Sequence, residues 1–267
     1  MSTPDPTLVT LLQATVAAGA SDLHLTVGRP ATARRDGVLV PFEGVNMITS
    51  ADTERMTMSL LDDKQKRELE EFSQVDFSFG LESVGRFRAN AYMQRNSLAL
   101  AFRVIPFRVR PLEELGAPPA THDLLQRPYG LVLVVGPTGS GKSTTLAAMI
   151  DRINETRPVH ILTIEDPIEY LHQHKMAMVN QREVGSDVNT FIDGLRSALR
   201  EDPDVILVGE MRDLDSISIT LTLAETGHLV FATLHTNDAA QALDRIVDVF
   251  PAERRDQIQL QLAATLQ

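Results

Sequence analysis

The sequence predicts an α/β protein with two domains, a smaller α+β domain followed by a larger domain built on a mainly parallel sheet. Two observations support this fold class. Strand-like segments dominate the first part of the chain, whereas near-continuous apolar runs alternate with helical patterns from residue 119 onward. A proline-rich stretch separates the two patterns. The chain has 267 residues, which is enough for two hydrophobic cores.

The first domain is expected over residues 1–105. The apolar spacing at 7–18 indicates a short amphipathic helix, and residues 51–72 are expected to form one or two helices. The remaining pattern predicts strands at 22–27, 31–42, 75–81, 85–93 and 97–105. Prolines then interrupt regular structure, so an interdomain linker is expected over residues 106–118.

The second domain is expected over residues 119–267. Strands are predicted from four apolar runs, at 131–135, 160–164, 205–209 and 229–233. Helical patterns lie at 142–154, 190–200, 214–226, 238–248 and 254–267. Fully apolar strands separated by helices indicate a parallel sheet that is covered on both faces. The last helical pattern reaches residue 267 without a cap, so this domain is expected to be incomplete at its C-terminal end.

Composition narrows the class of protein. Cysteine is absent, which excludes disulfides and thiolate metal sites within these residues. No apolar run approaches the ~20 residues needed to cross a bilayer, and the first residues lack a secretory signal, so a soluble cytoplasmic protein is expected. The net charge of -11 argues against broad affinity for nucleic acid, because phosphate backbones favour clustered Lys and Arg.

A phosphate-binding P-loop follows the apolar run at 131–135. Glycines at its turn allow positive φ and let backbone N–H groups approach a phosphate closely. We expect Lys142 to reach the β and γ phosphates of a nucleoside triphosphate and Ser143 to hold Mg²⁺. A glycine turn without a ligand would not need the lysine. The residues expected to bind the nucleotide are Gly136, Pro137, Thr138, Gly139, Ser140, Gly141, Lys142, Ser143 and Thr144.

Carboxylates follow two of the predicted strands. Glu210 comes directly after a buried strand, where a carboxylate can hold the water shell of Mg²⁺ or orient the attacking water. Three more carboxylates, at Glu165, Asp166 and Glu169, follow the preceding strand. A proline turn would aim Glu169 back toward the γ phosphate, so Glu169 is the preferred water activator. Glu165 and Asp166 are expected to have supporting or structural roles.

Two histidines and three arginines are weaker candidates. His235 follows the last predicted strand, where an imidazole can sense the γ phosphate or contact a neighbouring subunit, whereas His228 precedes that strand. Each can equally be a structural histidine. Arg86, Arg88 and Arg103 alternate on strands of the first domain. They are either solvated residues or arginine fingers that compensate γ-phosphate charge.

Four segments taken together resemble those of the secretion ATPase superfamily: Gly136 to Thr144, Ile161 to Glu169, Val205 to Asp213 and Gly227 to Asn237. Within it, the chain is most similar to the PilT-type retraction ATPases of type IV pili. The resemblance extends along almost the whole chain, through Ala20 to Leu25, Gly85 to Asn90, Asn180 to Gly185 and Asp244 to Pro251.

This resemblance implies a PAS-like N-terminal domain, a flexible linker and a RecA-like ATPase domain that binds nucleotide between the two domains. It implies that Glu169 is the catalytic acid and that Glu210 is the Walker B acid, which binds Mg²⁺ directly or through water. His228 and His235 would form the His box. Arg88 and Arg103 match positions that supply arginines to the nucleotide. The family continues through further C-terminal helices beyond this point.

The implied activity is Mg-dependent hydrolysis of ATP to ADP and phosphate in a homohexameric ring, which drives pilus retraction and twitching motility through domain closure and opening. The implied partner is an inner-membrane pilus platform protein, which would be the only link of this cytoplasmic motor to the inner membrane. Alternatives within the superfamily are an accessory retraction, pilus extension or type II secretion ATPase. Outside it, a RecA-like nucleic-acid motor and a nucleotide-binding scaffold without turnover are the rival classes.

Overall fold

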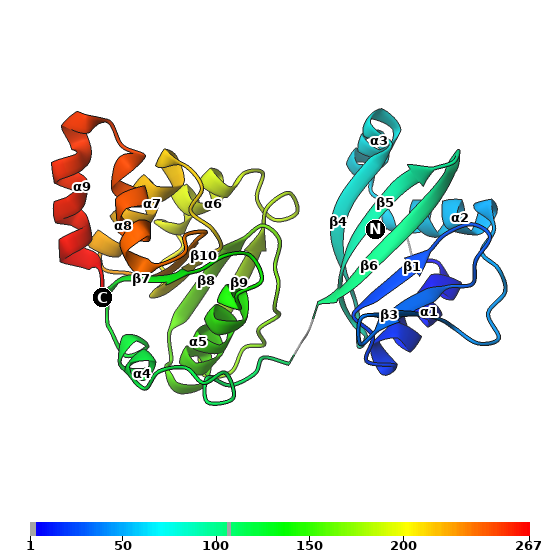
Figure 1. Cartoon of the computed structure of the whole chain (residues 1–267), viewed down its shortest axis with the longest axis horizontal. Helices are drawn as coiled ribbons and strands as arrows, with labels where there is room; N and C mark the ends of the chain where they lie inside the picture. Colours follow the sequence, from blue (N-terminus) through cyan, green and yellow to red (C-terminus); the bar gives the residue numbers. More distant parts are fainter. Residues whose placement is uncertain (1–3, 106–107) are drawn as a thin grey trace. The chain divides into compact units, whose positions relative to one another are not determined.

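The computed structural model describes residues 4–105 and 108–267, which belong to two compact units, Met1–Pro106 and Phe107–Gln267 (Figure 1). Each unit has its own sheet and its own hydrophobic core. Pro106 and Phe107, at the start of the predicted linker, lie outside the described residues. Leu112 is 2% exposed and packs in the core of the second unit. The described part of the predicted linker therefore contacts the second unit.

The first unit contains a six-stranded antiparallel sheet with strand order β3-β2-β1-β6-β5-β4. The strands are β1 (Asp22–Leu25), β2 (Thr32–Arg35), β3 (Val38–Pro41), β4 (Gln74–Leu81), β5 (Gly85–Gln94) and β6 (Ser97–Ile105). The segment 31–42, predicted as one strand, is a hairpin. Its turn residues Asp36 and Gly37 have φ values of 48° and 81°, as a tight two-residue hairpin turn requires.

Three helices cover one face of this sheet, α1 (Pro6–Ala17), α2 (Ser50–Leu60) and α3 (Asp63–Phe72). The predicted helical region 51–72 is two helices, because Asp62 accepts a hydrogen bond from the N–H of Gln65 and starts a new helix. Leu8 of α1 and Met56 of α2 pack with Phe87 of the sheet. The first unit thus has one buried face and one open face of its sheet.

The second unit contains a five-stranded parallel sheet with strand order β7-β11-β10-β8-β9. The strands are β7 (Gly130–Val135), β8 (His160–Glu165), β9 (Met178–Glu183), β10 (Val205–Val208) and β11 (Leu229–Leu234). β9 was not predicted. It is an edge strand with the polar sequence Met-Val-Asn-Gln-Arg-Glu, so a search for apolar runs does not find it.

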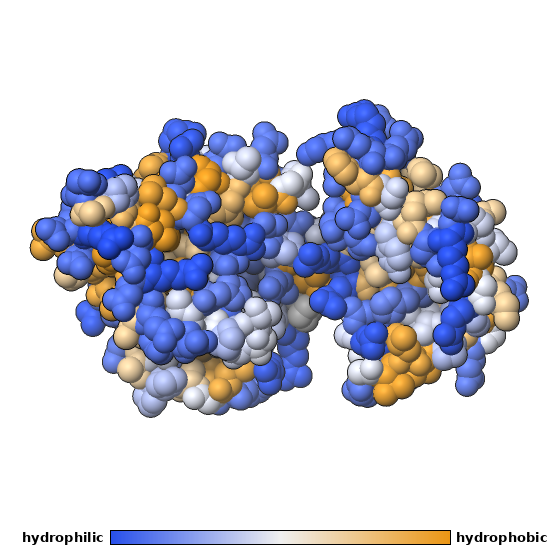
Figure 2. Space-filling view, turned by 45° about the horizontal axis from the view of Figure 1, so that its top comes forward, coloured by the Kyte–Doolittle hydropathy of each residue, from blue (hydrophilic) through white to orange (hydrophobic). Residues whose placement is uncertain are grey.

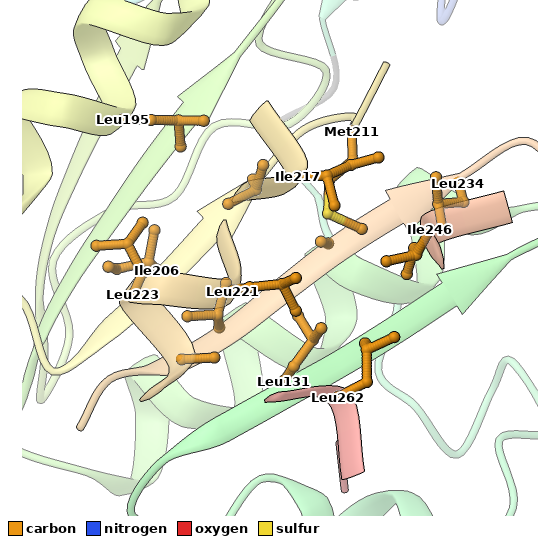
Figure 3. Packing of buried hydrophobic residues seen from close by; sticks show 14 of the residues in the cluster. Leu131, Leu195, Ile206, Met211, Ile217, Leu221, Leu223, Leu234, Ile246 and Leu262 are labelled. Carbon is orange, nitrogen blue, oxygen red and sulfur yellow. The ribbon is translucent and has the colours of Figure 1, made fainter. Parts of the chain in front are cut away.

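Helices cover both faces of the parallel sheet, as predicted. They are α4 (Ala120–Leu124), α5 (Lys142–Thr156), α6 (Phe191–Ala198), α7 (Leu214–Glu225), α8 (Ala239–Asp248) and α9 (Ala252–Thr265). Alternate residues of β10 face opposite cores: Ile206 packs with α7 and α9, and Val205 packs with α5. Figure 3 shows the first of these cores, where Leu131 of β7, Leu221 of α7 and Leu262 of α9 meet.

On the face shown in Figure 2, both units are mainly hydrophilic, with separate hydrophobic patches. In the first unit, the edge strand β3 is exposed at every residue, including Val38, Leu39 and Val40. Within residues 4–105 and 108–267, no helix is both long enough and apolar enough to cross a membrane.

Candidate active site

Most of the predicted site residues of the second unit lie at one edge of the parallel sheet. Since the strands all run in the same direction, their carboxyl ends meet at a single edge. The P-loop follows β7, Glu165 ends β8, Glu210 follows β10 and His235 follows β11. Residues that are far apart in the sequence therefore lie close together because of the strand order.

The P-loop connects β7 to α5 and has the backbone shape of a phosphate cradle. Gly136 and Gly141 have φ values of 153° and 95°. A Cβ atom on Gly136 would lie 2.5 Å from Oγ of Ser140, so a side chain here would collide inside the loop. Gly141 is the N-cap of α5 and offers no side-chain acceptor to the first-turn N–H groups. These N–H groups and the helix dipole favour an anion at this point, so the loop fits phosphate.

Lys142 is 9% exposed and its ammonium lies inside the loop. Its Nζ donates hydrogen bonds to the carbonyl oxygens of Gly136, at 2.8 Å, and Pro137, at 3.0 Å. The same Nζ lies 3.4 Å from Nδ1 of His235, and Oγ1 of Thr138 lies 3.5 Å from that nitrogen. Lys142 and His235, which are predicted to act at the γ phosphate, are therefore neighbours.

Glu210 extends this series of contacts. Its Oε1 lies 3.4 Å from Nε2 of His235, on the side of the ring opposite Lys142. Its Oε2 accepts a hydrogen bond of 2.8 Å from Nε of Arg212, and this bond raises the pKa of the guanidinium. Arg212 also lies 3.7 Å from the Asp166 carboxylate. Contacts therefore run from the P-loop lysine through His235 to the acid at the end of β10.

The three carboxylates after β8 differ in their surroundings. Glu165 is 9% exposed and accepts hydrogen bonds at Oε1 from Thr163, at 2.6 Å, and from Gln181, at 3.1 Å. Burial raises the pKa of this carboxyl. Asp166 and Glu169 are exposed, and the backbone N–H of Glu169 donates to the Glu165 carboxylate. Hydrogen bonds therefore hold Glu165 in the interior, whereas the Glu169 side chain is exposed.

The other predicted nucleotide residues lie at the start of α5. Ser143 follows Lys142 in the first turn and is partly buried. The hydroxyl of Thr144 lies 2.9 Å from the hydroxyl of Tyr170. This contact joins the P-loop helix to the segment that carries Glu169.

His228 is not brought to the P-loop within this chain. Its Nδ1 lies 2.8 Å from the carbonyl oxygen of Leu223 and 3.2 Å from Oγ1 of Thr226, at the end of α7. His228 and His235 flank the six-residue strand β11, so they are about 20 Å apart along the strand. The nucleotide role of His228 stays a prediction.

Arg88 and Arg103 are cross-strand partners on β5 and β6. Their side chains are exposed and lie on the face of the first sheet opposite the buried Phe87. Arg103 donates a hydrogen bond of 2.9 Å to Oδ1 of Asp22. Burial opposes ionisation of Asp22, but hydrogen bonds from Ser21 and Arg103 hold the pKa of its carboxyl below its usual value. The nucleotide role of both arginines stays a prediction.

Several residues at this edge were not predicted as site residues. Arg212 links the acids after β10 and β8. Tyr170 bonds the segment that carries Glu169 to Thr144 of α5, and Gln181 and Glu183 bond this segment from β9. The spacing of Glu210 and Arg212 at a strand end was a usable signal, since residues two apart in an extended chain point the same way. Gln181 and Glu183 lie in the segment Asn180 to Gly185 that carries the family resemblance, but their spacing gives no indication of their contacts, because their partners are distant in sequence.

Comparison with known proteins identifies relatives along most of the chain. The chain is 52% identical over 251 residues to the type IV pilus retraction ATPase PilT of Pseudomonas aeruginosa, covering 93% of this chain and 72% of that protein. It is 53% identical over 219 residues to a twitching motility protein of Neisseria gonorrhoeae, covering 82% of this chain and 59% of that protein.

The fold comparison gives the same result. The crystal structure of the pilus retraction motor PilT with bound ADP matches with a TM-score of 0.92 at 50% identity, over 97% of this chain and 76% of that one. The mixed α/β fold with its parallel sheet is therefore confirmed. The model of the family described as "Type II/IV secretion system protein" matches residues 6–267. The chain belongs to the type II/IV secretion system protein family.

Proposed function

We propose that this chain is the ATP-hydrolysing subunit of a motor that retracts type IV pili. The observation that carries the proposal is the series of contacts from Lys142 through His235 to Glu210, at the edge where the P-loop lies. A lysine inside a phosphate cradle and an acid at the same sheet edge are recurring parts of sites that transfer a phosphoryl group to water. Similarity to PilT extends the proposal from ATP hydrolysis to retraction and twitching motility.

In the proposed reaction, ATP is cleaved by water to ADP and phosphate. Lys142 and the P-loop N–H groups bind the β and γ phosphates. Ser143 and Glu210 are the residues that would hold Mg²⁺, Glu210 directly or through water. The ion, when bound, would neutralise charge on the phosphates. Glu169 accepts the proton of the attacking water, because its carboxylate is exposed while its backbone N–H is held by the buried Glu165 carboxylate. His235 reports on the γ phosphate through its contact with Lys142.

The family supports a more detailed architecture. We propose a PAS-like N-terminal domain over residues 1–105, a linker over 106–118 and a RecA-like ATPase domain over 119–267. Arg88, Arg103 and His228 are proposed to act on nucleotide in an assembled homohexamer. ATP binding would close the domains and product release would reopen them, which converts hydrolysis into movement.

The proposed partner is an inner-membrane pilus platform protein, which holds this cytoplasmic ring at the inner face of that membrane. The resemblance to pilus motors supports this partner, and the net charge of -11 argues against nucleic acid as the substrate. An accessory retraction, pilus extension or type II secretion role within the same superfamily is the alternative.

A cellular experiment separates these roles. In a deletion strain, retraction predicts hyperpiliated cells that do not twitch, and extension predicts cells without pili. Complementation with the wild-type chain should restore twitching, and complementation with Lys142→Ala should not. A deletion strain with normal twitching and normal pilus number would contradict a role in pilus dynamics and favour secretion, which is measured as exported protein.

The assignment of the two acids needs a separate biochemical test. Glu169→Gln should abolish most phosphate release, by a factor on the order of 100, and retain binding of ATP and Mg²⁺. Glu210→Gln should weaken the Mg²⁺ dependence of nucleotide binding as well as turnover. If Glu210→Gln loses only turnover and Glu169→Gln loses the Mg²⁺ dependence of nucleotide binding, the two roles are exchanged. If Glu169→Gln loses neither property, the role assigned to Glu169 is wrong.

A further inference from the structure

The segment from Glu165 to His172, which carries Glu169, is held by side chains of the edge strand β9. Successive residues of a strand point to opposite faces. Arg182 accordingly points to one face, where Nη1 donates to Oγ of Ser197 and also bonds Glu201 near α6. Gln181 and Glu183 point to the other face, where they contact the Glu165 to His172 segment.

Gln181 makes three hydrogen bonds to this segment. Its Nε2 donates to Oε1 of Glu165, at 3.1 Å, and to the carbonyl oxygen of Tyr170, at 2.8 Å. Its Oε1 accepts from the backbone N–H of His172, at 2.8 Å. An amide has two N–H donors, and both are used here. The one side chain therefore fixes the segment on both sides of Glu169.

Two further contacts restrict the same segment. The buried Glu183 accepts a hydrogen bond of 3.0 Å at Oε2 from the backbone N–H of Ile168. On the far side of Glu169, the Tyr170 hydroxyl lies 2.9 Å from Oγ1 of Thr144 in α5. The residues before and after Glu169 are thus fixed to β9 and to the P-loop helix, whereas the Glu169 side chain is exposed.

We propose that Gln181 is a positioning residue for hydrolysis, which holds Glu169 at the place where it can take a proton from water. This inference rests on the proposed role of Glu169. A general base must lie within hydrogen-bond reach of the water, and a displacement of about 1 Å costs on the order of 100-fold in rate. Gln181 supplies the constraint because it bonds backbone or side-chain groups at three points around Glu169.

The test uses Gln181→Met in the full chain, which keeps the length of the side chain and removes its three hydrogen bonds. We expect kcat to fall about 10- to 100-fold and the KM for ATP to stay within about twofold, because the P-loop is unchanged. Asn180→Met is the matched control. Asn180 precedes Gln181 on β9, and its Nδ2 contacts Nε2 of His160 instead of the Glu165 to His172 segment. It should keep the wild-type kcat.

A second comparison separates positioning from general stability. In a Glu169→Gln background, Gln181→Met should cause no further loss of turnover, since both changes remove the same proton acceptance. A purely structural role would lower both backgrounds equally, and that result would overturn the proposal. Gln181→Ala is the second variant, used if thermal unfolding shows that Gln181→Met is not folded. It removes the same three hydrogen bonds with a smaller side chain and should show the same dependence on Glu169.

The outcomes also distinguish this inference from the proposed function. If Glu169→Gln is inactive and Gln181→Met has the wild-type kcat, the positioning role is wrong and the role of Glu169 stands. If Glu169→Gln itself has the wild-type kcat, the role of Glu169 is wrong and the positioning role falls with it.

Discussion

The two sheets of this chain use their polar residues in different ways. In the antiparallel sheet of the first unit, neighbouring strands end at opposite edges, so Arg88 and Arg103 pair across the middle of an open face. In the parallel sheet of the second unit, the ends of β7, β10 and β11 share one edge, and Lys142, Glu210 and His235 meet there. A parallel sheet therefore brings the functional side chains at its strand ends together at one edge, whereas an antiparallel sheet distributes them between two edges.

This difference decides how far topology alone can assign a function. At the edge of the parallel sheet, strand order and direction are enough to place a lysine, a histidine and an acid within contact distance. On the open face of the first sheet, the contact between Arg103 and Asp22 is equally well formed but has a structural explanation. The four predictions below test this contrast.

The largest expected effect is at the P-loop. Lys142→Ala should lower phosphate release on the order of 100- to 1000-fold, because the ammonium stabilises charge that develops on the phosphates. The first unit should keep its thermal stability, since its core shares no residue with this site. Lys175→Ala is the control, because Lys175 pairs with Asp151 and Glu155 on the outside of α5. A wild-type rate in Lys142→Ala would show that hydrolysis does not occur at this edge.

The next effect concerns the core of the first unit. Phe87 is fully buried and stacks on Phe79 with ring centroids 5.6 Å apart. Phe87→Ala should lower the free energy of unfolding of this unit by about 3–5 kcal/mol. Denaturant unfolding should show the loss in one transition, with the transition of the second unit unchanged. Phe72→Ala, at a position that is 63% exposed, should change stability by less than about 0.5 kcal/mol. Equal shifts in both transitions would contradict independent cores.

A smaller effect is expected from the open face of the first sheet. Arg88→Ala should lower turnover by about tenfold if its guanidinium compensates phosphate charge, and thermal stability should stay the same because the side chain is exposed. Arg67→Ala, an exposed arginine on α3, is the matched control. Unchanged turnover in Arg88→Ala would show that Arg88 has no role in hydrolysis.

The smallest effect is a change in the pH dependence of stability. Burial raises the folded-state pKa of Glu165, so its contribution to stability is complete below the unfolded pKa and decreases as the pH rises through the folded pKa. Glu165→Gln has the same shape and no charge. Its melting temperature should exceed that of the wild type by a few degrees at pH 7.5, and this difference should shrink toward pH 4.5. A difference that grows at low pH would contradict this interpretation.

Contiguous features were predictable from the sequence. The P-loop consists of adjacent residues, and fully apolar runs located four of the five strands of the parallel sheet. The order of the strands in the sheet depends on which strands pair, and no local sequence pattern gives this information. The segment 31–42 was mistaken for one strand because its turn, Asp36-Gly37, is only two residues long.

Features that depend on tertiary contacts were not predictable. Gln181 lies on a polar edge strand, and its three partners are between 9 and 16 residues away in the chain. Arg212 approaches Asp166 only because β10 lies next to β8. His228 is the opposite example, because it is close to its motif partner His235 in sequence but distant from it in the structure. The strand β11 lies between the two histidines and places them at opposite edges of the sheet.

The carbonyl contacts of Lys142 have a consequence for affinity. The ammonium already has two hydrogen-bond acceptors in its own loop, the oxygens of Gly136 and Pro137. A phosphate oxygen that draws the ammonium away from these carbonyls exchanges one set of acceptors for another, and the free energy gained is then the difference between the two sets. The lysine accordingly contributes more to selecting anions over neutral ligands than to the absolute tightness of binding.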